Sequence, residues 1–174
     1  MEKIFFAEGS AFPTSISAVE RILSAHFGIA KAQISRTENG KPYLSKPEKQ
    51  LFFSISHTKT GLFIAFSDEN VGIDAEILDR KVRYQSILHK FPFEEREEIT
   101  SLEEFLRHWT VKESAVKWLG GTLAHDLNKL SYVHGVLHYE RLELPIHVTT
   151  LYLQGHVLSI CGEGDFSNAE FIIL

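Results

Sequence analysis

"HWTVKESAVKWLGG" (residues 108–121) closes a predicted helix and carries a carboxylate where an apolar side chain is expected. At about 100° per residue, Glu113 lies in the middle of the apolar stripe of this helix, with Lys112 and Lys117 on its two edges. A charge aimed at a core costs free energy unless something pairs with it. We therefore expect the fold to bring a cation to Glu113. The stripe consists of Leu102, Phe105, Leu106, Trp109 and Val116.

The composition is that of a globular protein with one domain or two small lobes. The chain has 174 residues, of which 44% are hydrophobic, so it can bury a sizeable core. Its net charge of −5 argues against a general binder of nucleic acid or of membrane surfaces. The single cysteine, Cys161, excludes an internal disulfide, and we expect it to be a core thiol. Because the sequence shows no signal peptide and no membrane-spanning apolar run, we expect a soluble, cytoplasmic protein.

Hydrophobic periodicity divides the chain into two halves, each with a helix followed by strands. The pattern predicts a helix over residues 14–28 and a helical stretch over 84–119 that is broken at 91–93 and restarts with a capping box at 101–104. The connectors between the first three strands are short enough for antiparallel hairpins. This order predicts an α+β fold of two lobes with a ligand site in the cleft between them. The predicted strands lie at 51–56, 61–67 and 71–77, and at several places within 129–174.

The strand "VGIDAEI" (71–77) supplies two of the candidate functional side chains. Asp74 and Glu76 leave the same face of the strand, about 6.5–7 Å apart along it. Two neighbouring carboxylates repel each other unless a cation lies between them, and oxygen ligands alone favour Mg²⁺. Glu113 could provide the third carboxylate. The alternative is a solvated strand face, with Glu113 paired to Lys117 one helical turn away.

Polar and basic residues that could hold phosphate groups occur near these carboxylates. Lys117 and Lys112 flank Glu113, and Ser56 and His57 end a predicted strand where hydroxyl and N–H groups could bind an anion. Lys41 lies on a stiff turn before a proline. Each residue also has an ordinary interpretation, as a solvated lysine or as a residue that merely ends a strand.

Four motifs, taken in this order, resemble the successive signatures of the 4′-phosphopantetheinyl transferases. They are "GKPYL" (40–44), "FSISHT" (53–58), "VGIDAE" (71–76) and "WTVKESAVKWLGG" (109–121). The chain is most similar to the longer, two-lobed type that serves peptide and polyketide synthases. The resemblance implies two similar α/β lobes related by a pseudo-twofold axis, each with a small antiparallel sheet packed on a helix. We expect lobes at 1–76 and 77–174, with the active site between them.

The resemblance also implies the reaction and the residues that perform it. A serine of an apo acyl or peptidyl carrier protein would attack coenzyme A, accept 4′-phosphopantetheine and release 3′,5′-ADP. Mg²⁺, with Mn²⁺ as a possible substitute, would be held by Asp74, Glu76 and Glu113. Glu113 would accept the serine proton and Lys117 would neutralise charge on the pyrophosphate. Coenzyme A would contact Lys41, Pro42, Ser56, His57 and Lys112, and the protein is expected to be a monomer.

The N-terminus departs from the family pattern. Longer members carry basic residues there that grip the 3′-phosphate of coenzyme A, whereas the first 20 residues here contain only Lys3. His57, Lys59 or Arg36 could take over this role. Two other functions stay open: an inactive relative that binds a carrier protein or coenzyme A, and a Mg²⁺-dependent hydrolase of a nucleotide pyrophosphate.

Overall fold

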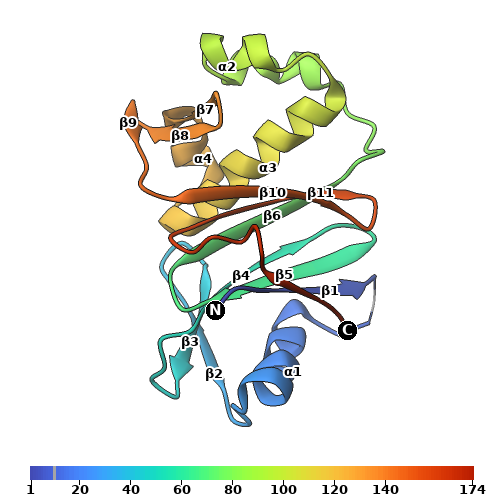
Figure 1. Ribbon diagram of the computed structural model, residues 1–174, viewed down its shortest axis with the longest axis vertical. Coiled ribbons are helices and arrows are strands. Elements are labelled where there is room, and N and C mark those ends of the chain that lie inside the picture. The colour runs from blue at the N-terminus through green and yellow to red at the C-terminus, as the bar shows by residue number, and fades with distance from the viewer. Residues whose placement is uncertain (10) are drawn as a thin grey trace.

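Two β-sheets pack face to face, and one long helix covers the outer face of each (Figure 1). The computed structural model describes residues 1–9 and 11–174. The first sheet has the strand order β12-β1-β5-β4 and the second β10-β11-β6, with two small sheets, β2-β3 and β7-β8-β9, beside them. This arrangement confirms the predicted α+β class. The strands are β1 (Lys3–Glu8), β2 (Gln33–Arg36), β3 (Pro42–Lys46), β4 (Phe52–His57), β5 (Gly61–Ser67), β6 (Val71–Ile77), β7 (Leu130–Val133), β8 (Val136–Tyr139), β9 (Leu142–Glu143), β10 (His147–Leu153), β11 (His156–Gly162) and β12 (Glu170–Ile173).

The helices follow the predicted pattern, with one additional break. The predicted break at 91–93 is confirmed, since helical structure stops at Lys90 and resumes only at Phe93; the segment before it forms two short 3₁₀ turns, and a second break separates α2 from α3. Within residues 1–9 and 11–174, none of the helices is both long and apolar enough to cross a membrane. The helices are α1 (Ser15–Phe27), α2 (Phe93–Glu98), α3 (Leu102–Leu119) and α4 (Leu123–Asp126), with 3₁₀ turns η1 (Tyr84–Ser86), η2 (Leu88–Lys90) and η3 (Leu127–Lys129).

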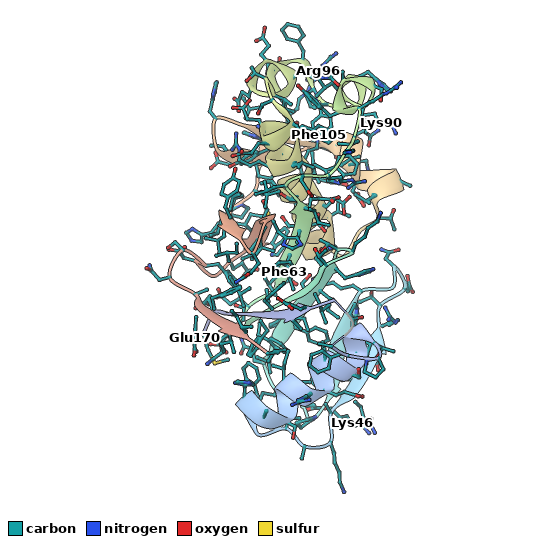
Figure 2. The ribbon with its side chains drawn as sticks, turned by 90° about the vertical axis from the view of Figure 1, so that its right-hand side faces the viewer. Lys46, Phe63, Lys90, Arg96, Phe105 and Glu170 are labelled. Carbon is teal, nitrogen blue, oxygen red and sulfur yellow. The ribbon has the colours of Figure 1, made fainter. Side chains whose placement is uncertain are left out.

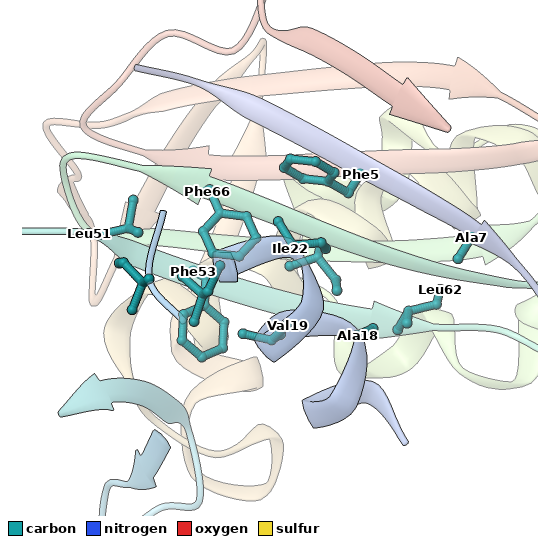
Figure 3. Packing of buried hydrophobic residues seen from close by; sticks show 12 residues of the cluster. Phe5, Ala7, Ala18, Val19, Ile22, Leu51, Phe53, Leu62 and Phe66 are labelled. Atoms are coloured by element: carbon teal, nitrogen blue, oxygen red, sulfur yellow. The ribbon is translucent and has the colours of Figure 1, made fainter. Parts of the chain in front are cut away.

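Strands β1 and β5 are buried on both faces because they lie between α1 and the second sheet. Phe5 and Phe66 point toward α1, where they pack with Ile22 (Figure 3). Phe6 and Phe63 leave the opposite faces and join the core between the sheets; Figure 2 shows Phe63 at mid-height in the molecule. Because side chains alternate along a strand, the two strands contribute to two cores.

Local capping signals place the ends of both long helices. The helix predicted over 14–28 is confirmed as α1, with Thr14 at its N-cap and Gly28 in the left-handed conformation at its C-cap. Helix α3 begins after Ser101 and ends at Gly120 in the same way. Its capping box is only half formed, because the carboxylate of Glu104 accepts its hydrogen bonds from Thr100.

One of the two predicted hairpins is wrong. Strands β4 and β5 pair as an antiparallel hairpin, but β5 and β6 do not pair. Strand β5 already has β1 on one edge and β4 on the other, so no edge is left for β6. The chain therefore crosses at residues 68–70 into the second sheet, where β6 pairs with β11 along its whole length.

Each half of the chain contributes one strand to the sheet formed mainly by the other half. The C-terminal strand β12 pairs in parallel with β1 and so belongs to the first sheet, whereas β6 belongs to the second. The division into lobes at 1–76 and 77–174 stays a prediction. The core between the sheets, with Ile4, Phe63, Ile73 and Leu158 among its members, shows that the two halves are packed against each other.

Gly72 in β6 allows α3 to lie directly on the strand. A Cβ atom at this position would stand 2.0 Å from the carbonyl oxygen of Ser114 and 2.6 Å from the backbone nitrogen of Trp118. Backbone atoms cannot rotate away, so a side chain here would push the helix off the sheet. This close approach sets the height of α3 above β6.

We predict that Gly72→Ala destabilises the protein by roughly 3 kcal/mol, the upper part of the range for overpacking. Urea unfolding followed by circular dichroism measures the change. Gly162→Ala in the paired strand β11 is the matched control, because its Cβ would lie 3.1 Å from the nearest atom, the Asn70 carbonyl oxygen. Equal stability losses in the two variants would show that the helix is not held at this distance.

Candidate active site

Three carboxylates lie near one another where α3 crosses β6. Asp74 is buried on β6, Glu76 follows it on the same face, and Glu113 reaches them from α3, half-buried. Burial, and after it the neighbouring charges of Asp74 and Glu76, raise the pKa of Glu113 to about 7, against the opposing effects of Lys117 and Trp109. The structure thus brings the three predicted carboxylates within electrostatic reach of one another.

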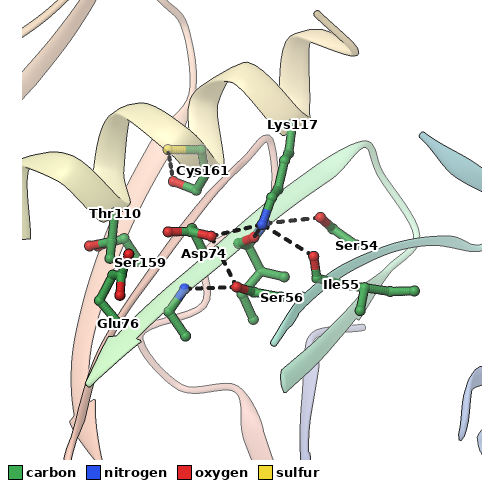
Figure 4. Close-up of polar contacts among 12 residues, drawn as sticks. Ser54, Ile55, Ser56, Asp74, Glu76, Thr110, Lys117, Ser159 and Cys161 are labelled. Carbon is green, nitrogen blue, oxygen red and sulfur yellow. Dashed lines mark hydrogen bonds and ion pairs between the residues drawn. The ribbon is translucent and has the colours of Figure 1, made fainter. Parts of the chain in front are cut away.

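The three carboxylates have different partners. Asp74 Oδ1 accepts hydrogen bonds from Ser56 Oγ (2.9 Å) and Lys117 Nζ (2.8 Å), as Figure 4 shows. Glu76 forms an ion pair with Arg80. Within residues 1–9 and 11–174, Glu113 has no ion pair, so the alternative pairing with Lys117 is not observed. Glu113 is therefore the least compensated charge of the cluster.

The donor set suits a hard divalent cation, but the side chains do not yet surround one. Carboxylate oxygens are the ligands that Mg²⁺ prefers, and a cation would relieve the repulsion that raises the pKa of Glu113. As positioned, no three acidic, histidine or cysteine side chains in the described part of the chain converge on one point. Metal binding would require these side chains to move closer together.

The outer edge of β6 lies beside the edge of β4, but the two strands do not form a ladder. Side chains instead satisfy the backbone groups of this edge; we call this arrangement the β4–β6 seam. Its members come from β4, from α3 and from the turn before β3. The contacts are Lys41 Nζ to the Val71 carbonyl (3.1 Å), the Ile73 N–H to Ser54 Oγ (3.1 Å), Lys117 Nζ to the carbonyls of Ile73 (2.8 Å) and Ile55 (3.2 Å), and the Ala75 N–H to Ser56 Oγ (3.0 Å).

Two residues predicted to contact coenzyme A thus take part in the seam. Lys41 turns inward, where Nζ also donates to Asn70 Oδ1 (2.8 Å) and burial lowers its pKa to about 8. Ser56 accepts from a backbone N–H and donates to Asp74. Pro42 begins β3, at the end of the same turn. All three lie on the side of β6 that faces β4.

His57, at the exposed end of β4, lines a groove of about 950 Å³ that runs past Glu76. Three further basic side chains lie along it, and two of them follow β6 directly. Arg80 and Lys81 were not predicted to line the site, although the basic run in "DRK" (79–81) comes soon after the carboxylate strand. The lining residues are His57, Thr58, Lys59, Glu76, Ile77, Asp79, Arg80 and Lys81.

Lys112, which was predicted to contact coenzyme A, lies away from Asp74, Glu76 and Glu113. Its side chain is fully buried, with Nζ 3.1 Å from Glu95 Oε2 of α2 and 4.3 Å from the centroid of the Phe91 ring. Burial lowers its pKa, an effect that Glu95 opposes. Glu95 Oε1 is also 3.1 Å from Nδ1 of the buried His108. These residues connect α2 to α3, and the structure does not bring Lys112 to the carboxylates.

The sequence pattern of the 4′-phosphopantetheinyl transferase superfamily matches residues 70–161, more than half of the 174-residue chain. The match begins at β6 and includes α3, and therefore all three carboxylates. The chain belongs to this superfamily. This phosphopantetheinyl transferase carries its acidic cluster inside the matched region, whereas Lys41, Ser56 and His57 lie before it.

Three relatives illustrate how far the similarity of this phosphopantetheinyl transferase extends. It is 30% identical to the 4′-phosphopantetheinyl transferase AcpT of Escherichia coli over 132 residues, which are 71% of this chain and 67% of AcpT. It is 25% identical to the transferase pptA of Paxillus involutus, covering 55% of that protein. It is 31% identical to the mouse L-aminoadipate-semialdehyde dehydrogenase-phosphopantetheinyl transferase over 58% of this chain and 38% of that protein.

We predict that Glu113→Gln makes the transferase more stable at high pH. The pKa of Glu113 is near 7 in the folded protein and 4.5 without the fold, so its ionisation penalises folding increasingly from about pH 4.5 to pH 7 and fully above it. The variant should match the unmodified protein at pH 4 and exceed it by up to roughly 3 kcal/mol at pH 8.

Urea unfolding at both pH values, with EDTA present, measures this difference. Glu103→Gln, on the exposed side of the same helix, is the control that removes a carboxylate without removing a buried one. A stability difference between Glu113→Gln and the unmodified protein that is the same at pH 4 and pH 8 would contradict the prediction.

Proposed function

We propose that this transferase moves 4′-phosphopantetheine from coenzyme A to a serine hydroxyl of an apo carrier protein, releasing 3′,5′-ADP. The cluster of Asp74, Glu76 and Glu113 carries the proposal, because it lies in the family-matched region and beside a groove with four basic side chains. Such a groove suits a ligand that carries several phosphates. Family membership identifies 4′-phosphopantetheine as the transferred group. The acidic cluster supports a site for the transfer on this chain.

In the proposed step, Glu113 accepts the proton of the attacking serine, directly or through a water. The serine oxygen bonds to the phosphorus that bears pantetheine, and the bond from this phosphorus to the bridging oxygen breaks. The electron pair leaves with 3′,5′-ADP. Glu113 suits this task because, within the described residues, its carboxylate has no ion pair and so keeps an oxygen for the serine proton.

We further propose that Asp74, Glu76 and Glu113 hold Mg²⁺, for which Mn²⁺ could substitute. The bound ion would supply positive charge to the pyrophosphate oxygens. Asp74 is oriented for this by Ser56 and Lys117, which both bond to Oδ1. In the described part of the chain, no hydrogen-bond donor reaches its other oxygen, Oδ2. Asp74 can therefore offer one oxygen to a cation while the other keeps its orientation.

The groove along His57, Lys59, Arg80 and Lys81 is the proposed site for the phosphates of coenzyme A. His57 lies at the end of β4 and Lys59 in the turn after it, and both line the groove. Arg36, the other candidate, belongs to β2 and donates to the Gly40 carbonyl (2.8 Å). The groove therefore favours His57 and Lys59 over Arg36.

We predict that the protein adds one phosphopantetheine to an apo acyl carrier protein when supplied with coenzyme A and Mg²⁺, and that EDTA abolishes the transfer. Intact-protein mass spectrometry detects the product. Asp74→Asn and Glu113→Gln should each lower the rate at least about 100-fold, the range for loss of a general base or of a charge-stabilising group. Glu103→Gln is the matched control and should retain activity.

Carriers from fatty-acid, polyketide and peptide synthases are tested in parallel. No transfer to any of them, with coenzyme A still bound, would contradict the proposal and identify a binding relative. Release of 3′,5′-ADP without any carrier protein would instead identify a pyrophosphate hydrolase. Transfer that persists unchanged in Glu113→Gln would show that another group accepts the serine proton.

For the groove, we predict that His57→Gln raises the KM for coenzyme A roughly tenfold, as expected when a charge-assisted contact to a phosphate is lost. The kcat should change less, because the phosphate contact is made in the bound ground state as well as in the transition state. Steady-state kinetics at varied coenzyme A separates the two constants. Arg36→Gln is the control. A larger KM effect for Arg36→Gln than for His57→Gln would place the phosphates on the β2–β3 side.

A further inference from the structure

His156 is a buried polar residue outside the acidic cluster, at the first position of β11. Its ring packs edge to face on Phe63, with the ring centroids 5.0 Å apart. Nδ1 lies 2.7 Å from the carbonyl oxygen of Gln154, and Nε2 lies 2.9 Å from Thr58 Oγ1 and 3.0 Å from Thr60 Oγ1. Both nitrogens of a residue that is only 2% exposed are therefore held by polar atoms.

The partners of the ring fix its tautomer. A carbonyl oxygen only accepts, so Nδ1 carries the proton, and in the neutral ring Nε2 keeps its lone pair. Nε2 therefore accepts a hydroxyl proton. Thr58 Oγ1 already accepts the N–H groups of Thr60 (3.2 Å) and Gly61 (3.0 Å), so its own proton is free for Nε2. The alternative acceptor, the Gly61 carbonyl, is farther away at 3.4 Å.

This contact joins segments from different sheets. Thr58 and Thr60 belong to the turn between β4 and β5 of the first sheet, whereas His156 pairs with Ile77 in the second sheet. Figure 1 shows the β4–β5 turn and the β10–β11 turn at the same end of the two sheets. In the part of the chain that the structure describes, no other hydrogen bond connects residues 57–61 to the second sheet.

The same two segments form the walls of the basic groove. The β4–β5 turn provides His57 and Lys59, and the end of β6 provides Glu76 and Ile77. His156 contacts both walls, since it pairs with Ile77 and is bonded to the turn, but it does not line the groove itself. The ring thus sets the separation of the two walls at this end.

We infer that His156 is a positioning residue that holds the β4–β5 turn against the second sheet and so keeps His57 and Lys59 in place for the phosphates of coenzyme A. The inference rests on the proposed function in taking the groove as the site of these phosphates. His156 acts through the turn and does not touch the substrate. A turn that moves freely must be ordered each time a ligand binds, and this lowers the affinity.

Two amide variants separate the two contacts of the ring. The side chain in His156→Gln reaches as far as Nε2 and keeps an acceptor for the threonines, whereas that in His156→Asn reaches only as far as Nδ1 and keeps the contact to Gln154. Both variants lose the aromatic ring. His156→Asn should raise the KM for coenzyme A at least about fivefold with kcat within about twofold, and His156→Gln should keep KM within about twofold.

A combined variant tests whether His156 acts through the turn. Added to His57→Gln and Lys59→Gln, the substitution His156→Asn should not raise KM further, because residues that act through one another are not additive. Leu153→Ala is the control for a general loss of stability. It removes core packing from the strand partner of His156 and should leave KM unchanged.

NMR and hydrogen exchange test the contact without substrate. The nitrogen chemical shifts of the ring should place the proton on Nδ1. Peptides that cover residues 57–61 should exchange at least about tenfold faster in His156→Asn than in the unmodified protein, because the turn is released from the second sheet. Absence of coenzyme A binding to the unmodified protein would contradict the proposed function, while these two measurements would still test the contact.

Four results would each overturn the inference: a ring proton on Nε2, equal KM values in His156→Asn and His156→Gln, an equal rise of KM in Leu153→Ala, or an additive rise in the combined variant. If His156→Asn does not fold, Thr60→Val takes its place, since it removes one hydroxyl partner of Nε2 from outside the groove. It should raise KM at least about threefold, and an unchanged KM would overturn the inference.

Discussion

The unpaired edges of β4 and β6 are the constraint on which the site depends. Buried backbone N–H and C=O groups require partners, and two strands that lie edge to edge normally supply them to each other. Here the strands belong to different sheets, and serine and lysine side chains provide the bonds instead. Because the contacts come from side chains, Asp74 can join the same network. In a continuous sheet, neither Ser56 nor Lys117 would be needed at this edge, and nothing would fix the carboxylate.

The second polar cluster, formed by Glu95, His108 and Lys112, belongs to the support of α3. All three side chains are fully buried. A buried pair of charges adds little net stability, but removing one partner leaves the other uncompensated, which is costly. Separating α2 from α3 would leave both charges uncompensated, so the pair opposes such a separation. Neighbouring lysines of one motif thus have different surroundings: Lys112 binds α2, and Lys117 binds the sheets.

Local elements of the fold could be predicted, and long-range partners could not. Thr14, Gly28 and Gly120 act through bonds within a few residues, so the sequence shows the ends of α1 and α3 directly. The residues alone left two arrangements open for Glu113, a carboxylate cluster with Asp74 and Glu76 or a pair with Lys117, and in the structure Lys117 pairs with Asp74 instead. The edge chosen by β6 depends on β5 being filled by β1, far away in sequence. Likewise, Lys112 can be buried only because Glu95 comes from another element.

The charges around Glu113 explain why its carboxylate is left without an ionic partner. Lys117 compensates Asp74, and Arg80 compensates Glu76, so two cations meet three carboxylates. The remaining negative charge falls on Glu113, where burial and the charges of Asp74 and Glu76 together raise its pKa to about 7. Complete pairing would have made the cluster an inert structural network. One unmatched carboxylate beside a basic groove instead leaves the site ready for a proton or a cation, and both belong to the chemistry of phosphoryl transfer.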